Sequence, residues 1–393
     1  MRVCFVVQRY GLEINGGAEL HCRWIAEHMS LHHEVEVLTT RAFDYVTWKN
    51  RYPRGTTTVN GVPVRRFSVT RPRRPDRFGR IQSFILECEH READELRWLD
   101  EEGPRSPALL RYVRRNRANF DYFFFFSYRY YHSFHGIRAV PGKSILVPTA
   151  ERDPIIHLRI FRDIFNLPRA IIYNSPEERA MINLVARNEG VPGDVVGVGS
   201  VIPPESSAAR FRARHGLDGG YILYIGRIDE NKGFPGLFDH FLRFKAETGA
   251  AVKLVLIGST IMNIPSHPDI RHLGFLEEQD KFDALDGALA LMMPSYYESL
   301  SMVTLEAWAL GKPVLANARC EVLRGQCLRS NAGLFYEGYS EFKEALALVL
   351  ESDGLRRALG ENGRKYFLAN YTWDRITAKY QALLDRLEKD VRV

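Results

Sequence analysis

Residues 291–315 read LMMPSYYESLSMVTLEAWALGKPVL, and this stretch decides the fold. An apolar run ends at Met293, a short polar loop follows, and a segment of helix-forming residues runs from 302 to 310. Gly311 and Pro313 end the predicted helix just before the next apolar run. A buried strand, a helix and a second buried strand in this order are the repeating unit of a parallel sheet covered by helices.

The same alternation of short apolar runs and longer amphipathic segments extends over both halves of the chain. The predicted strands cover residues 3–7, 34–39, 62–69, 122–126, 144–147, 170–173, 195–198, 221–225, 253–257, 289–293 and 313–316. The predicted helices include 18–31, 176–187, 236–248 and 302–310. Several strands are apolar almost throughout, as expected for parallel strands with helices on both faces. The pattern therefore predicts two doubly wound α/β domains with parallel sheets.

Length and turn-forming residues place the domain boundaries. A chain of 393 residues is long enough for two domains, and the proline- and serine-containing segment 202–208 separates them. We expect a first domain over 1–202, a second over 203–370, and a C-terminal helix within 371–393 that crosses back to the first domain. The charged segment 78–116 lacks strand signals and predicts helical insertions in the first domain.

The apolar runs and the cysteines indicate where such a chain works. No run of the sequence reaches the roughly 18 apolar residues of a membrane-spanning helix, and the first apolar run is too short for a signal peptide. The five cysteines form no CxxC pair, a pattern that suits neither a disulfide framework nor a zinc site. The expected location is therefore the reducing cytoplasm.

The net charge of +6 is unevenly distributed, because residues 1–200 carry +7 and the remainder −1. Ten basic residues and one acid, Asp76, lie within 49–80. The basic residues are Lys49, Arg51, Arg54, Arg65, Arg66, Arg71, Arg73, Arg74, Arg77 and Arg80. Either this stretch binds an anionic membrane surface or a phosphorylated acceptor, or it is a solvated arginine-rich loop and edge strand. Few aromatic residues lie between the arginines, which disfavours nucleic acid as a partner.

The loop and helix start within 291–315 predict an anion site. Ser299 and Ser301 are suitable N-caps, and the free amides at the start of a helix favour an anion. Glu306 lies one turn further, roughly 6 Å along the axis, which matches the separation of a ribose from its phosphate. Glu298, on the loop, would then face a sugar. The alternative is an ordinary strand–loop–helix with an incidental carboxylate.

Residues 221–233, YILYIGRIDENKG, place a second loop after another apolar strand. Gly226 permits close approach of a ligand to the backbone, and Arg227 and Lys232 can converge on a diphosphate and stabilise it without a metal ion. The alternative is a solvated turn. Near the start of the chain, the pair Gly16 and Gly17 precedes a helix at a position where parallel sheets bind ligands, although such a pair is more often structural.

These motifs resemble those of the retaining family 4 glycosyltransferases. The resemblance rests on GRIDENKG at 226–233, on Glu298 and Glu306 with seven residues between them, and on AWALGKPV at 307–314. GGAE at 16–19 and NYTWD at 370–374 add to it, and it extends over almost the whole chain, most weakly over 70–115. The resemblance implies a GT-B fold, in which two Rossmann-like domains face each other across a cleft. The first domain would be the acceptor side and the second would bind a nucleotide-diphosphate sugar.

The resemblance also implies roles for individual residues. The expected catalytic residues are Glu298, Arg227, Lys232 and Glu151. The expected donor-binding residues are Gly16, Gly17, Gly226, Phe275, Leu276, Ser299, Leu300, Ser301, Met302, Val303 and Glu306. Arg227, Lys232 and the amides of 301–303 would hold the diphosphate, Glu306 the ribose and Glu298 the donor sugar, with the base near Phe275. No metal ion and no cofactor is expected besides the nucleotide-sugar substrate.

Two positions depart from the family pattern. Glu151 stands where such enzymes usually have a histidine that contacts the donor sugar. A carboxylate there either accepts from a sugar hydroxyl or assists the acceptor, or it marks an altered donor, a lost activity or an ordinary charged loop. Ser301 stands where a glycine is common. His132 and His135 follow an apolar strand, and we expect them to pack against neighbouring segments rather than to touch a substrate.

The expected reaction transfers a glycosyl group from a nucleotide-diphosphate sugar to an acceptor hydroxyl with retention, in the assembly of a bacterial-type polysaccharide or glycoconjugate. The acceptor would be a saccharide or a lipid-linked saccharide, and the enzyme would be cytoplasmic or peripheral at the inner face of the membrane. The alternatives are a GT-B epimerase or phosphorylase, and a non-catalytic binder of sugar nucleotides or polyanions.

Overall fold

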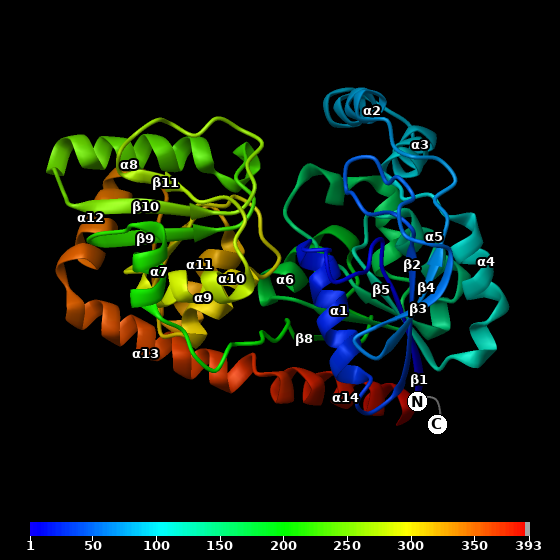
Figure 1. Ribbon diagram of the computed structural model, residues 1–393. Coiled ribbons are helices and arrows are strands. Elements are labelled where there is room, and N and C mark those ends of the chain that lie inside the picture. Colours follow the sequence, from blue (N-terminus) through cyan, green and yellow to red (C-terminus); the bar gives the residue numbers. More distant parts are fainter. Residues whose placement is uncertain (390–393) are drawn as a thin grey trace. The chain divides into compact units, whose positions relative to one another are not determined.

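The computed structural model describes residues 1–389, which divide into two units (Figure 1). The first unit contains Met1–Val198 together with the last helix from Ile376 onward, and the second contains Gly199–Arg375. The chain therefore leaves the first unit at Val198, slightly before the expected boundary at 202. Residues 390–393 of the predicted C-terminal segment lie outside the described residues.

The first unit is built on a sheet in the order β3-β4-β2-β1-β5-β6-β7-β8. Its strands are β1 (Arg2–Val6), β2 (Glu34–Thr40), β3 (Gly55–Val59), β4 (Val62–Phe67), β5 (Tyr122–Phe126), β6 (Ser144–Val147), β7 (Ala170–Tyr173) and β8 (Gly193–Val195). All neighbouring strands are parallel except the hairpin of β3 and β4. The strand order reverses between β1 and β5, which is the switch point where doubly wound sheets bind ligands.

Helices cover both faces of this sheet. The helices of this unit are α1 (Gly17–Met29), α2 (Pro75–Glu87), α3 (Glu92–Glu102), α4 (Pro107–Arg115), α5 (Tyr131–Ala139), α6 (Pro176–Ala186) and α14 (Trp373–Lys389), of which α2 packs on α3 rather than on the sheet. Phe123 and Phe125 of β5 lie in a core cluster with side chains of α3, α4 and α5. Phe124 and Phe126 point to the other face, where they contact Tyr380 of α14 and His21 of α1. The alternation of the strand thus supplies apolar side chains to both layers.

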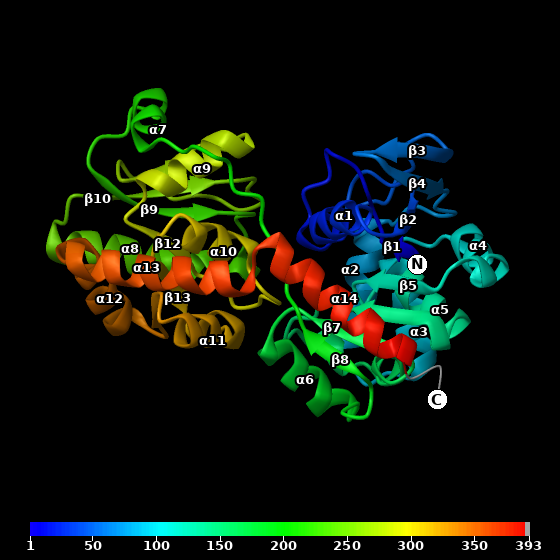
Figure 2. The same ribbon diagram turned by 90° about the horizontal axis from the view of Figure 1, so that it is seen from below.

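The last helix docks on the first unit through an apolar face. Leu383, Leu384 and Leu387 are fully buried, and Arg386 forms an ion pair with Asp194 of β8 at 2.6 Å. Figure 2 shows α14, in red, lying along this unit near β8.

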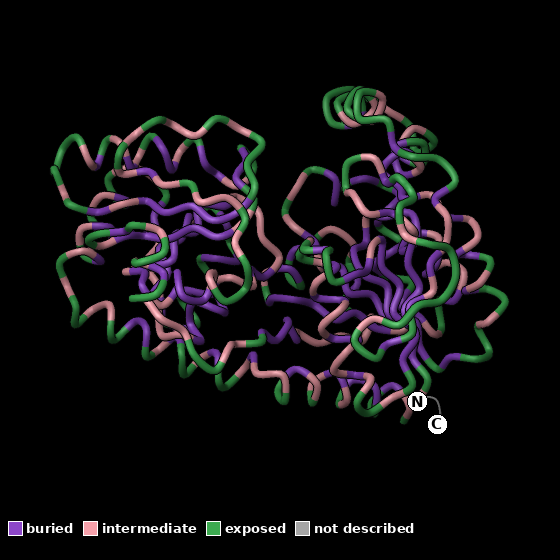
Figure 3. The backbone as a smooth tube through the Cα atoms, viewed as in Figure 1, coloured by how far each residue is buried: buried purple, intermediate pink, exposed green. Residues whose placement is uncertain are grey.

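The second unit contains a wholly parallel sheet in the order β11-β10-β9-β12-β13-β14. Its strands are β9 (Gly220–Ile225), β10 (Val252–Ile257), β11 (Ile270–His272), β12 (Ala290–Met293), β13 (Val314–Asn317) and β14 (Gly333–Tyr336). Its helices are α7 (Ala208–His215), α8 (Phe234–Thr248), α9 (Glu278–Gly287), α10 (Met302–Ala309), α11 (Glu321–Ser330), α12 (Tyr339–Glu351) and α13 (Asp353–Asn370). Figure 3 shows most strands of both sheets as buried segments of the chain, whereas β3 is largely exposed.

Short 3₁₀ turns lie between these elements. They are η1 (Arg117–Asn119), η2 (Pro141–Lys143), η3 (Pro154–His157), η4 (Arg159–Phe161), η5 (Asp163–Phe165) and η6 (Glu230–Lys232). The segment predicted as helical insertions, 78–116, is confirmed as α2, α3 and α4. None of the helices within residues 1–389 is both long and apolar enough to cross a bilayer.

One predicted strand needs correction, and three strands of the structure were not predicted. The predicted strand 195–198 is wrong beyond Val195, because the amides of residues 196 and 197 both turn to the carbonyl of Tyr173 as the chain leaves the sheet. Strands β3, β11 and β14 were not predicted from the sequence. The hairpin of β3 and β4 has a clear signal in Asn60 and Gly61, both at positive φ, as a two-residue hairpin turn requires.

Candidate functional site

The loops after β9 and β12 meet at the carboxyl edge of the second sheet. Gly233 packs so closely on the Pro294 carbonyl oxygen that any Cβ there would collide with it. Asn317, at the end of β13, donates a hydrogen bond to the same oxygen at 2.9 Å. The sequence places these loops after different strands, and the structure brings them into contact because β9 and β12 are neighbours.

Lys232 and Glu298 form an ion pair between these two loops. The Lys232 Nζ lies 2.7 Å from Glu298 Oε1 and 3.4 Å from the Tyr297 carbonyl oxygen. Arg227 pairs with Asp229, and Asp229 also accepts a hydrogen bond from the Lys232 amide at 2.9 Å, which caps the turn η6. Asp229 is buried and was not singled out from the sequence. It holds both basic residues of the motif in place.

The start of α10 has no side-chain cap from Ser301. The Ser301 hydroxyl pairs with the Thr304 hydroxyl at 2.9 Å instead of accepting from an amide of its helix, so the predicted serine cap is wrong at this position. The backbone of Ser301 is left-handed, with φ of +70°, which is a conformation that glycine adopts at lower cost. The amides of Met302 and Val303 therefore begin the helix without this cap.

Glu306 is buried one turn into α10. Only 3% of the residue is exposed, and its Oε1 accepts a hydrogen bond from Lys281 of α9 at 2.9 Å. Lys281 also pairs with Glu278 at 2.7 Å. Burial raises the pKa of Glu306, and the Lys281 ammonium opposes that rise. Burial alone would lower the pKa of Lys281, but the two carboxylates raise it above its usual value.

Lys281 was missed because no sequence motif marks it. The side chain comes from a helix that precedes the motif of Glu298 and Glu306 in the chain, and only the packing of α9 beside α10 brings it there. Phe275 and Leu276 lie in the loop between β11 and α9, so this ion pair also links the loop to Glu306.

Three glycines bring the loops after β9, β10 and β11 together. A Cβ at Gly258 would collide with the Gly226 carbonyl oxygen, and the Gly258 amide donates to the Gly274 carbonyl oxygen at 2.7 Å. Phe275, which follows, is 69% exposed, whereas Leu276 is half-buried. An exposed aromatic ring on a backbone held by glycines is suited to stacking against a flat ligand.

Two further residues expected at the site, Ser299 and Leu300, lie in the loop after β12 and are less exposed than Phe275. Ser299 is half-buried and Leu300 is buried.

In the first unit, Gly16 makes room for an ion pair. The Cβ of any other residue would collide with the carboxylate of Glu19, which forms a partly buried pair with Arg9 at 2.7 Å. The glycine therefore leaves room for the Glu19 carboxylate, and Gly17 begins α1 beside it.

Glu151 lies in a loop that is held on both sides. The Ala150 amide donates to buried Glu178 at 2.5 Å, and Asp153 pairs with Arg129 at 2.9 Å. Glu178 also accepts from the Asn174 amide, and burial raises its pKa to about 8. The half-buried side chain of Glu151 thus projects from a backbone with little freedom to move.

His132 and His135 are packed as expected. His132 is buried and lies 3.0 Å from the Phe126 carbonyl oxygen through Nε2. His135 packs against the rings of Tyr131 and Phe134. Burial lowers the pKa of both imidazoles to about 4, so both rings are neutral at pH 7.

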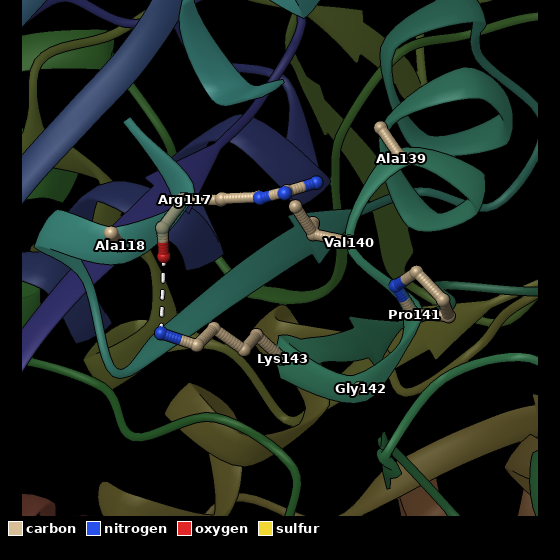
Figure 4. Close-up of a pocket in the computed structure, with 7 residues that line it drawn as sticks. All are labelled: Arg117, Ala118, Ala139, Val140, Pro141, Gly142 and Lys143. Atoms are coloured by element: carbon tan, nitrogen blue, oxygen red, sulfur yellow. Dashed lines mark hydrogen bonds between the residues drawn. The ribbon is translucent and has the colours of Figure 1, made fainter. Parts of the chain in front are cut away.

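A pocket of about 410 Å³ lies at the amino ends of β5 and β6, at the edge of the first sheet opposite to Gly16 and Glu151 (Figure 4). Lys143 reaches from it to the carbonyl oxygens of Arg117 and Phe120 at 3.0 and 2.7 Å. None of the residues singled out from the sequence lines this pocket.

Comparison with known proteins agrees with the motifs. The model of the family "Glycosyl transferases group 1" matches residues 206–366, so the family resemblance is confirmed for the second unit. Over 201 residues the chain is 27% identical to the MMP alpha-(1->4)-mannosyltransferase of Mycolicibacterium hassiacum, which covers 47% of this chain and 48% of that protein. The chain spans about half the length of the curated relatives it matches.

Solved structures show the fold. Sucrose-phosphate synthase from Thermosynechococcus elongatus has a TM-score of 0.74 at 16% identity, with 99% of this chain and 100% of that chain covered. HepE of Anabaena, solved in complex with UDP-glucose, has a TM-score of 0.71 at 15% identity over 99% and 100% of the two chains. The predicted GT-B fold of two Rossmann-like units is thereby confirmed.

The pairing of Lys281 with Glu306 predicts a pH-dependent loss of stability in Lys281→Met. The variant leaves a buried carboxylate unpaired, which costs about 3–5 kcal/mol of unfolding free energy at neutral pH. The folded-state pKa of Glu306 lies above its unfolded value, so the stability linked to this group is greatest at low pH and falls as pH rises through the folded pKa. The deficit of the variant, measured by urea unfolding, should therefore shrink as the pH falls.

Two further variants control this experiment. Lys281→Met/Glu306→Gln should recover most of the loss, because the unpaired charge is removed. Lys343→Met, which breaks a partly exposed pair with Glu247, should cost far less than Lys281→Met, because solvent screens that pair. A loss that is the same at every pH and persists in the double variant would show that Lys281 acts only through packing.

Proposed function

We propose that this chain, whose second unit carries a glycosyl transferases group 1 domain, is a glycosyltransferase that uses a nucleotide-diphosphate sugar and retains the anomeric configuration. The observation that carries the proposal is the gathering of Lys232, Glu298 and the start of α10 at one edge of the second sheet, with Glu306 one turn inside. Carboxyl edges of parallel sheets are where nucleotides bind.

Each donor part has a matching protein group in this proposal. The amides at the start of α10 and the side chains of Lys232 and Arg227 take the diphosphate. The second oxygen of Glu306 accepts from the ribose hydroxyls, because its first oxygen is held by Lys281. Phe275 stacks on the base, and Glu298 accepts from the donor sugar. The UDP-glucose complex of HepE, a protein of the same fold, supports a nucleotide sugar as the donor.

The proposed chemistry is displacement on one face of the sugar. The glycosidic bond to the diphosphate breaks, the acceptor oxygen bonds to the anomeric carbon from the same side, and the acceptor proton passes to the departing diphosphate oxygen. Lys232 and Arg227 stabilise the charge that develops on that oxygen, without a metal ion. Lys232 is already oriented by Glu298, so little reorganisation accompanies the charge separation.

Glu151 is proposed to accept from a sugar hydroxyl in the first unit. The two clamps on its loop support this role, because a carboxylate on a fixed backbone orients a substrate better than one on a solvated loop.

The acceptor is proposed to be a saccharide or lipid-linked saccharide that reaches the first unit at the cytoplasmic face of a membrane. Several members of the basic stretch are already engaged, since Arg65, Arg71, Arg73 and Arg77 form ion pairs with glutamates. The exposed residues Lys49, Arg54, Arg74 and Arg80 are left for an anionic surface. Each is worth about 1 kcal/mol near such a bilayer.

Co-sedimentation with anionic vesicles tests the membrane contact. The protein should pellet at low salt and be released as ionic strength rises. Arg74→Ala/Arg80→Ala should pellet less, whereas Arg71→Ala, whose side chain is paired with Glu101, should change less. Equal pelleting of all three proteins would remove this surface from the proposal.

Thermal unfolding with a panel of nucleotides and nucleotide sugars tests the donor site. A ligand at about 100 times its Kd should add about 2.7 kcal/mol of stability. Glu306→Gln should weaken binding of the matching nucleoside diphosphate by about 1–3 kcal/mol, because charged hydrogen bonds to the ribose are lost. If no nucleotide stabilises the protein, or if Glu306→Gln binds as tightly as the wild type, the ribose assignment fails.

Metal independence is tested with EDTA. Transfer activity should survive excess chelator, and Lys232→Ala should lower turnover by about 10²-fold or more, because the leaving diphosphate loses its cation. A matched control is Lys253→Ala, on the edge-proximal strand β10 away from the two loops. Complete loss of activity with EDTA that Mg²⁺ restores would falsify the proposed role of the two basic residues.

A further inference from the structure

Three arginines of the first unit surround Tyr52 and form what we call the arginine cluster: Arg41, Arg51 and Arg66. Arg41 donates from Nε to the Tyr52 carbonyl oxygen at 2.7 Å. The Arg66 guanidinium lies over the Tyr52 ring, 4.5 Å from its centroid. Arg51 directly precedes Tyr52 and stacks on Phe43 at 4.1 Å. Tyr52 thus brings together three cations from separate parts of the sequence.

Two of these cations face each other across a short antiparallel ladder. Ala42 and Asn50 form a β-bridge, and the Arg51 amide donates to the Arg41 carbonyl oxygen at 2.8 Å. Residues 41 and 51 are therefore opposite each other, in a position where like charges destabilise the pairing. An anion between the two guanidinium groups would reverse the sign of that interaction.

The cluster has no carboxylate partner among the described residues, since no Asp or Glu oxygen lies within 4 Å of its guanidinium nitrogens. In contrast, the neighbouring Arg65 and Arg73 of the same basic stretch pair with Glu36 and Glu102. Arg66 is the clearest case. It is 4% exposed, it donates to Thr57 and to the Tyr10 carbonyl oxygen, and its Nε has no acceptor in the part of the chain that the structure covers.

A buried guanidinium without a counter-ion is unfavourable, and burial lowers the pKa of Arg66 accordingly. Glu13 is the acid whose charge interacts with the Arg66 guanidinium. A backbone hydrogen bond and the Tyr52 hydroxyl, at 2.8 Å, lower its pKa, and the charges of Arg66 and Arg51 add to this. Its exposed carboxylate lies outside ion-pair distance of the cluster.

The position of the cluster is one where ligands bind. Arg41 follows β2 directly, Arg66 lies near the end of β4, and Tyr10 follows β1, so all three belong to the carboxyl edge of the first sheet. We propose that the arginine cluster binds a phosphate group of the acceptor. Exposed Arg51 contacts the phosphate oxygens with its planar fork. Half-buried Arg41 donates from Nε to the Tyr52 carbonyl oxygen and from Nη1 to the Ser68 hydroxyl, so it contacts the phosphate through its remaining nitrogen. Buried Arg66 adds charge from beneath. That the phosphate belongs to an acceptor rests on the proposed glycosyltransferase function, whereas the phosphate site itself does not.

Titration with inorganic phosphate, followed by calorimetry, tests the site. All proteins carry Lys232→Ala, because that change weakens the second unit's own candidate phosphate-binding residues. Arg51→Gln should bind phosphate about tenfold more weakly than this parent, since one charged fork is lost. Arg54→Gln, an equally exposed arginine of the same stretch, should bind as the parent does.

Glu13→Gln should bind phosphate more tightly, because it keeps an acceptor for Tyr52 and removes the nearby negative charge. Arg51 is exposed, so its substitution leaves the fold intact, and the thermal unfolding midpoint checks this. The proposal is overturned if the parent binds no phosphate, or if Arg51→Gln and Arg54→Gln bind it equally.

Vesicles of phosphatidylcholine with phosphatidic acid separate the two sources of a phosphate. Release of vesicle-bound protein by inorganic phosphate, absent in Arg51→Gln, identifies a lipid phosphate as the ligand. Binding of inorganic phosphate that leaves the vesicle-bound fraction unchanged identifies a soluble phosphorylated acceptor. If the protein binds phosphate at this cluster but no nucleotide in the thermal panel, the phosphate site stands and the proposed transferase function fails.

Discussion

The contact of Gly233 with the Pro294 carbonyl oxygen is the constraint on which the candidate site depends. The backbones of the loops after β9 and β12 touch there, and no side chain fits between them. Because the loops are this close, Lys232 reaches Glu298 at 2.7 Å and Asp229 can hold Arg227 and the turn η6 together. A larger residue at 233 would separate the loops and with them the cation and the carboxylate. The chemistry proposed for the diphosphate thus rests on a glycine that touches no substrate.

Buried charges are arranged differently in the two units. In the second unit, Lys281 forms an ion pair with buried Glu306, so the carboxylate proposed to bind a ribose is held by the protein itself. In the first unit, buried Glu101 and Glu102 bind several arginines of the basic stretch and join α3 to the strand ends. Part of the positive charge of residues 49–80 therefore forms ion pairs with buried carboxylates, and part remains at the surface. Within residues 1–389, the arginine cluster of Arg41, Arg51 and Arg66 forms no such ion pair with a carboxylate.

In each unit, residues singled out from the sequence are oriented by a second residue. Glu298 orients Lys232, Asp229 orients Arg227, and Glu178 and Arg129 fix the backbone on either side of Glu151. Enzymes that act by orientation and charge stabilisation need such second partners, because a misplacement of about 1 Å costs about 10²-fold in rate. The strained backbone of Ser301 fits the same pattern, since it aims the first amides of α10.

The sequence alone determined the two parallel-sheet domains, most of the strands and the four charged residues of the two motifs. Strand and helix periodicity, glycine punctuation and the spacing of Glu298 and Glu306 are local properties, so they can be read without the fold. Prediction from the sequence missed the edge strands β3, β11 and β14, which are short and only partly buried. It also misplaced the end of β8. Only the tertiary structure decided that Lys281 meets Glu306, that Gly16 makes room for Glu19, and that Arg41, Arg51 and Arg66 share one tyrosine. Lys281 with Glu306, and Arg41 with Arg66, join segments whose separation in the chain carries no periodic signal, because the fold sets which segments become neighbours. Gly16 and Glu19 are close in the chain, but the pairing of Glu19 with Arg9 places the carboxylate beside the glycine.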